Sequence, residues 1–139
     1  MWRRVDPPST TIDVIMGVVM IVTGVAFAVM GAAAIVRPAM VPAQFGAGAE
    51  TAEIRTEVRA VYGGFGLAMA ALLIGAAATS SSYRDGVALT VGIALAGMAV
   101  GRAVGAVLER PQGVYPTVAF LLGEAVAAAA LVVGVLIER

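Results

Sequence analysis

The run VIMGVVMIVTGVAFAVMGAAAIV occupies residues 14–36 and contains no charged residue. An α-helix needs about 20 residues to cross a hydrocarbon core of about 30 Å, so this run is long enough to span a membrane. The apolar core of a cleavable signal peptide is only about 7–15 residues long, so we expect a permanent span. Three further apolar runs have spanning length: residues 60–79, 87–108 and 117–137.

Composition agrees with a membrane protein. The chain has 139 residues, of which 60% are hydrophobic and 13% charged, with a mean hydropathy of +0.96. A soluble domain has about a quarter charged residues. The net charge is zero, so no basic surface is available to bind nucleic acid.

Several reactive residue types are missing. The sequence contains no His, Cys, Lys or Asn. The usual ligands of zinc, haem and iron–sulfur clusters are therefore absent, and so is a lysine for a Schiff base. We expect no metal site, no cofactor and no enzymatic activity. A GC-rich genome would also deplete Lys and Asn, so composition alone does not decide between function and coding bias.

The links between spans predict how the helices are arranged. Residues 37–57 form the longest link, with an irregular first half and a helix that begins near Thr51 and continues into the second span. Residues 80–86 and 109–116 are expected to be tight polar turns. Short links make neighbouring helices antiparallel, so we predict an all-α, up-down-up-down four-helix bundle forming one membrane domain over residues 1–139.

The N-terminal segment contains orientation and capping signals. Thr10 is predicted to cap the first helix, with Asp13 three residues later completing a capping box. The arginines outside the spans are almost evenly divided between the two faces of the membrane. Arg3 and Arg4, which precede the first span, give the face with the termini a small excess, and such an excess favours the cytoplasmic side. We expect both termini on the cytoplasmic side.

Two helices carry regularly spaced glycines, which permit close helix packing in a membrane. They are Gly17, Gly24 and Gly31 in the first span and Gly97, Gly101 and Gly105 in the third. Glycine is common in this chain, so part of the spacing can be chance. The second series suits either internal packing or the seam of a homo-oligomer.

Arg102 and Glu124 interrupt otherwise apolar spans, at a cost of about 2.5–3.5 kcal/mol each near a helix centre. Each lies roughly 10 Å below the same membrane face, on consecutive antiparallel helices, so we predict that they pair. Glu57, Arg59 and Tyr62 enter the membrane from that face. These five residues either neutralise one another and fix helix register, or line a polar recess between the second, third and fourth spans, closed by the 37–57 loop.

The same residues carry a family resemblance. The run EVRAVYGGFG at residues 57–66, together with Gly101-Arg102 and Glu124, resembles the small bacterial membrane family catalogued as domain of unknown function 4345. The resemblance covers roughly residues 37–139, and the first span fits by hydropathy alone. It implies a four-span protein of bacterial origin and supplies no activity, substrate or cofactor. We expect this protein in the bacterial inner membrane.

Three classes of function stay open. The first is a non-catalytic protein that binds a lipid-like or quinone-like amphiphile with a neutral or zwitterionic head, or that serves as an accessory subunit of a larger membrane complex. The second is a small proton-coupled transporter using Glu124 and Arg102. Many transporters contain inverted repeats, but the repeated sequence here is limited to Arg-Ala-Val at residues 59–61 and 102–104. The third is an enzyme with Glu124 or Glu57 as its acid–base group.

Overall fold

The computed structural model describes residues 11–79, 81–111 and 113–137. All regular structure in these ranges is helical. The elements are α1 (Thr11–Val36), α2 (Met40–Ala43), α3 (Ala52–Val58), the π-helix η1 (Arg59–Gly64), α4 (Phe65–Ala77), α5 (Ser81–Glu109) and α6 (Thr117–Ile137). The segments α3, η1 and α4 follow one another without a break, as one long helix.

Four of these helical segments are long and apolar enough to cross a membrane. They are Thr11–Val36, Ala52–Ala77, Ser82–Glu109 and Thr117–Ile137. The predicted all-α membrane protein with four spans is therefore confirmed.

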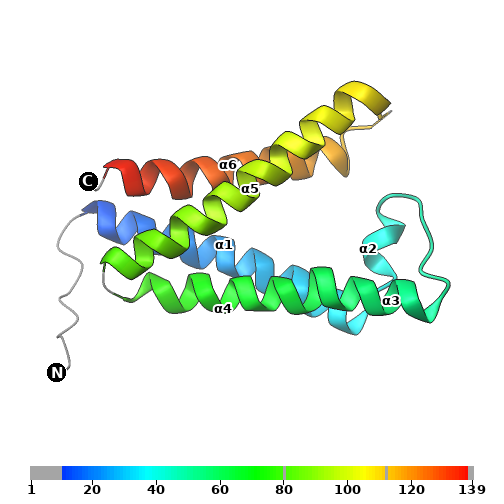
Figure 1. Ribbon diagram of the computed structural model, residues 1–139, viewed down its shortest axis with the longest axis horizontal. Helices are drawn as coiled ribbons and strands as arrows, with labels where there is room; N and C mark the ends of the chain where they lie inside the picture. The colour runs from blue at the N-terminus through cyan, green and yellow to red at the C-terminus, as the bar shows by residue number, and fades with distance from the viewer. Residues whose placement is uncertain (1–10, 80, 112, 138–139) are drawn as a thin grey trace.

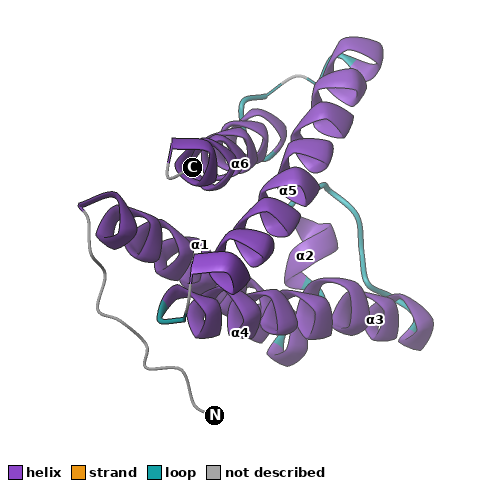
Figure 2. Ribbon diagram, turned by 60° about the vertical axis from the view of Figure 1, so that its left-hand side comes forward, coloured by secondary structure: helices purple, strands orange, loops and turns teal. Residues whose placement is uncertain are grey.

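The spans form two antiparallel pairs, α1 with α4 and α5 with α6 (Figure 1). The pairs meet where α1 begins and α6 ends, and there the core contains the fully buried Met16, Met20, Leu73, Leu131 and Val135. Toward the other end α5 rises away from α4, so the two pairs diverge (Figure 2). The bundle is thus closed at one end and splayed at the other.

Glycines of α1 bring this helix into close contact with the helix of the second span. A Cβ atom added at Gly24 would lie 2.7 Å from Cγ1 of Ile74, and one added at Gly31 would lie 2.9 Å from the backbone nitrogen of Leu67. Gly17 is looser, with its nearest neighbour at 3.6 Å. Gly24 and Gly31 therefore lie at close helix contacts, whereas Gly17 has only an ordinary van der Waals neighbour.

The glycine series of α5 behaves differently. A Cβ atom at Gly97, Gly101 or Gly105 would meet nothing within 4 Å in the described part of the chain. The glycine that packs α5 onto α6 is Gly92, where an added Cβ would lie 2.8 Å from Cγ2 of Val132. Gly97 lies about 140° around the helix from Gly92, because each residue turns an α-helix by about 100°. The series does not pack inside the bundle, and a seam between copies stays a prediction.

The links agree with the sequence analysis at two places and differ at two. The helix predicted to begin near Thr51 does so, and Thr51 caps α3 by accepting a hydrogen bond from the backbone nitrogen of Ile54 at 3.3 Å. The 109–116 link is also confirmed: α5 ends at Glu109, and Arg110 turns the chain with a φ of 48°.

The expected turn at residues 80–86 is wrong, because α5 begins at Ser81. This stretch has no proline to interrupt a helix. The expected irregular start of the 37–57 loop is also wrong in part, because α2 forms there. The predicted cap at Thr10 lies outside the described residues, whereas Asp13 is in the first turn of α1.

Candidate functional site

Arg102 of α5 and Glu124 of α6 form an ion pair inside the membrane-spanning region. The Nε of Arg102 donates a hydrogen bond to Oε2 of Glu124 at 2.8 Å. The side chains are 25% and 12% exposed, so both are largely covered by protein. The pairing predicted from their matched depth is confirmed.

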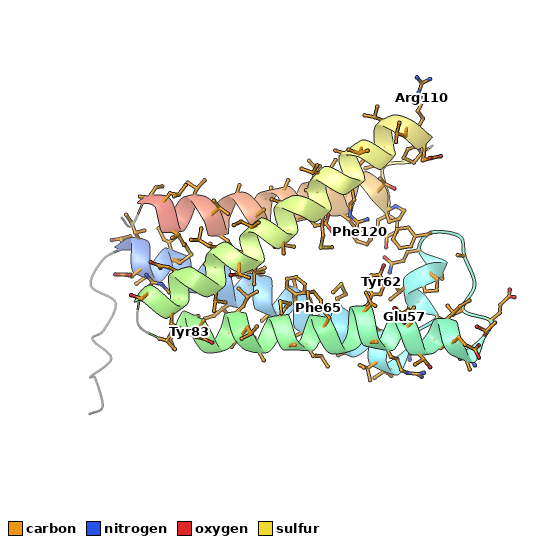
Figure 3. All side chains as sticks on the ribbon, viewed as in Figure 1. Glu57, Tyr62, Phe65, Tyr83, Arg110 and Phe120 are labelled. Carbon is orange, nitrogen blue, oxygen red and sulfur yellow. The ribbon has the colours of Figure 1, made fainter. Side chains whose placement is uncertain are left out.

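Aromatic side chains connect this pair to the loop after α1. The guanidinium carbon of Arg102 lies 5.2 Å from the ring centroid of Phe120, within cation–π range. The Phe120 ring in turn makes edge-on contacts with Tyr115 at 5.7 Å and Phe45 at 6.4 Å. The Tyr115 hydroxyl donates a hydrogen bond to Oε1 of Gln44 at 2.6 Å. The 37–57 loop therefore contacts the start of α6, beside Phe120 (Figure 3).

A cavity of about 290 Å³ lies between α1, α5 and α6. Among the described residues, Glu124 is its single charged lining residue, and Thr23 adds a hydroxyl. The other lining residues are Ala26, Phe27, Met30, Leu95, Met98, Ala119, Phe120, Gly123 and Ala127. Met30 and Met98 are 38% and 44% exposed, so the cavity has an open side on the surface that faces lipid.

The cavity is not where the sequence placed the recess. The expected walls were the second, third and fourth spans, whereas the observed walls are the first, third and fourth. Glu57, Arg59 and Tyr62 do not line it. Of the five predicted residues, only Arg102 and Glu124 contact each other among the described residues. The other three lie on the second span, in α3 and η1.

Arg59 has a different partner. Its Nε donates a hydrogen bond to the backbone oxygen of Ile35 at 3.1 Å, in the last turn of α1. A cation at a helix C-terminus satisfies carbonyl groups that have no partner within the helix. The described residues provide neither an ion pair nor a hydrogen bond for the side chain of Glu57, which is exposed. Tyr62 extends from η1 toward the α5–α6 pair (Figure 3).

The motif at residues 59–64 forms the π-helix η1, which the sequence analysis missed. A Cβ atom at Gly63 would lie 2.6 Å from Cδ1 of Ile35, so α1 approaches η1 closely. A π-helix adds one residue to a helical turn and shifts the faces of the residues around it. The adjacent glycines at 63 and 64 were the available sequence signal. The recess was predicted from the depths of these residues, whereas η1 and α4 pack mainly against α1, which keeps this motif apart from Glu124.

A second ion pair at the closed end was also missed. Arg84 Nη2 lies 2.8 Å from Oδ1 of Asp13, and Arg84 is only 5% exposed. This contact joins the start of α5 to the start of α1. The sequence analysis had treated Asp13 as part of a cap and Arg84 as part of a turn, and no local pattern relates two residues so far apart in the chain.

A larger cavity, of about 380 Å³, lies between α4 and α5. Its described lining residues are uncharged: Met69, Leu72, Ser82, Tyr83, Gly86, Val87, Thr90 and Val91. No three acidic side chains of the described ranges gather closely enough to hold a metal ion. The cavity beside Glu124 is therefore the better candidate for a site with head-group selectivity.

Comparison with known proteins places the chain in one family. The family model described as "Domain of unknown function (DUF4345)" matches residues 15–135. No curated protein and no solved structure matches the chain.

Proposed function

We propose that this chain, which belongs to the family described as domain of unknown function DUF4345, is a non-catalytic membrane protein that binds a lipid-like amphiphile. The observation that carries the proposal is the cavity between α1, α5 and α6, which has apolar walls and one ion-paired carboxylate. Ligand sites in proteins are typically apolar cavities with a few polar groups that orient the ligand.

The position of the cavity supports a ligand taken from the bilayer. Thr23 lies midway along α1, and the other lining residues of α1 lie between it and Met30, so the cavity is at membrane depth. Its volume of about 290 Å³ is near the lower end of the range for ligand pockets, about 300–1,000 Å³. An amphiphile would place its tail against Phe27, Leu95 and Met98 and its head beside Glu124.

The proposed absence of catalysis follows from the chemistry available to the site. Glu124 is the acid–base candidate nearest the cavity, and its carboxylate is already bonded to Arg102. The other charged candidates do not line the cavity, so the described residues offer Glu124 no second ionisable group there.

Filling the cavity tests the proposal. Gly123 lines it, and a Cβ atom there would meet nothing within 4 Å, so Gly123→Leu would occupy the cavity without a backbone clash. Gly75→Leu is the matched control, because Gly75 also has open space around its Cβ position and lines neither cavity. Both variants and the wild type would be purified from native membrane, and the amphiphiles bound to them would be identified by mass spectrometry.

We expect Gly123→Leu to lose a bound species that wild type and Gly75→Leu retain. Equal amounts of the same amphiphiles in all three proteins would contradict ligand binding in this cavity. That result would favour the accessory-subunit hypothesis, for which the outward glycine series of α5 offers a packing surface.

A further inference from the structure

We infer that the amphiphile in the cavity between α1, α5 and α6 has a single chain and an uncharged hydroxyl head, an alcohol or a phenol. This inference rests on the function proposed above and specifies the ligand class of the same site. It follows from the charge balance at Glu124, the unused hydrogen-bonding capacity of its carboxylate and the size of the cavity.

The charge of Glu124 is already balanced. Arg102 binds one carboxylate oxygen, Oε2, at 2.8 Å and stacks on Phe120, while the cavity itself is lined by Glu124. A cationic head would place a second positive charge against one carboxylate. An anionic head would approach that carboxylate from the cavity side and be repelled. Both kinds of head also carry a large desolvation cost in an apolar site.

The other carboxylate oxygen of Glu124 has an unused hydrogen-bonding capacity. Within the described residues, no group donates a hydrogen bond to Oε1. An ionised carboxylate has about four acceptor positions, and Oε1 is not among the buried atoms that lack a partner in the described ranges, so a ligand can reach it. A ligand that donates a hydrogen bond can use this acceptor, whereas an ester, an ether or an oxidised quinone offers acceptors only.

A hydroxyl group fits both conditions, because it donates a hydrogen bond and has no net charge. Thr23 is the second polar group in the wall, and its hydroxyl can both donate and accept, so it does not select between heads. The cavity of about 290 Å³ is small, which suits one chain better than the two chains of a phospholipid. The larger cavity between α4 and α5 has uncharged walls in the described part of the chain and should show no such selectivity.

Four probes with the same chain separate the possible heads: dodecanol, its methyl ether, dodecylamine and dodecanoate. Binding to the purified full-length protein in lipid nanodiscs would be measured by native mass spectrometry. A hydrogen bond to a charged group should make dodecanol bind about tenfold tighter than the methyl ether. We expect the amine and the carboxylate to bind more weakly than dodecanol.

The double variant Arg102→Leu/Glu124→Leu removes the acceptor while keeping the site neutral, so the alcohol and the ether should then bind equally. The comparison of the four probes on wild type stands even if this variant does not fold. Equal binding of alcohol and ether to wild type, or tightest binding of the amine or the carboxylate, would overturn the hydroxyl head. If either result were found and Gly123→Leu abolished binding of the probes, the cavity would still be the amphiphile site. Only the assignment of a hydroxyl head would then be wrong. Failure of all four probes to bind would overturn the single-chain hydroxyl ligand, while the native amphiphiles lost or retained in Gly123→Leu decide the proposed function.

Discussion

At the scale of single residues, the arginines placed within spans have specific partners. Arg102 binds Glu124, Arg84 binds Asp13, and Arg59 binds the backbone oxygen of Ile35. A charged side chain costs free energy in the hydrocarbon core unless it is paired or reaches the interface. These contacts therefore explain how a strongly apolar chain tolerates charges within its helices.

The pair between α5 and α6 can be tested by a double-mutant cycle. Arg102→Leu or Glu124→Leu alone leaves a covered charge unpaired, so we expect each to lower the free energy of unfolding by about 3–5 kcal/mol. Replacing both should recover much of this loss. Unfolding in mixed detergent, followed by circular dichroism, would measure all four proteins.

Glu109→Leu is the control for this cycle. Glu109 ends α5, is exposed and has no partner within the described ranges, so its replacement should change stability by no more than about 0.5 kcal/mol. If the double variant is as unstable as the two single variants added together, Arg102 and Glu124 are not coupled.

At the scale of helices, two glycine series with regular spacing have different surroundings. Gly31 lies against the backbone of the second span, whereas Gly97 faces open space. The difference arises because a membrane helix can present any of its faces to a neighbour, and the spacing alone does not say which face is used.

Adding one methyl group at each position tests this difference. In Gly31→Ala the new Cβ would lie 2.9 Å from the nitrogen of Leu67 and 3.0 Å from the oxygen of Gly63, so one helix must shift. Such overpacking typically costs about 1–3 kcal/mol. Gly97→Ala has no such clash and should be neutral or slightly stabilising, because alanine favours helix by up to about 1 kcal/mol.

Thermal unfolding in one detergent would compare the two alanine variants with wild type. Similar melting temperatures for Gly31→Ala and wild type would show that the close contact between α1 and the second span is absent in the detergent-solubilised protein. A large loss in Gly97→Ala would indicate that a partner, absent from the isolated chain, packs on α5.

At the scale of the whole molecule, the bundle is closed at one end and splayed at the other. The buried core and the contact between Arg84 and Asp13 hold the closed end. At the splayed end the α5–α6 pair separates from the α1–α4 pair (Figures 1 and 3). There, Gln44 and Phe45 of the 37–57 loop contact Tyr115 and Phe120 at the start of α6. The cavity beside Glu124 lies where the pairs begin to separate.

The number of spans predicts the topology. Four spans return the chain to the side on which it began, and α1 begins at the same end of the bundle where α6 ends (Figure 1). We expect reporter fusions at the two termini to give signals from one compartment, and we propose the cytoplasm because of Arg3 and Arg4. Signals from opposite compartments would mean that one of the four helices does not cross the membrane.

The sequence by itself determined the features that depend on local properties. Hydrophobicity summed along a segment predicts a span, because each residue contributes separately to the free energy of insertion. The rise of a helix predicts depth, so the contact between Arg102 and Glu124 could be predicted from their positions in the chain. The cap at Thr51 was also predictable, since its donor lies only three residues away.

Only the tertiary structure decided which faces of the helices meet. The partner of Arg59 is at the end of α1, and the partner of Arg84 comes from the start of another helix. The cavity is built by α1 as well as α5 and α6, and α1 carries no charge near it that could have marked it in the sequence. The physical reason is that rotation of a membrane helix about its own axis leaves its hydrophobicity unchanged, so packing against its neighbours sets that rotation.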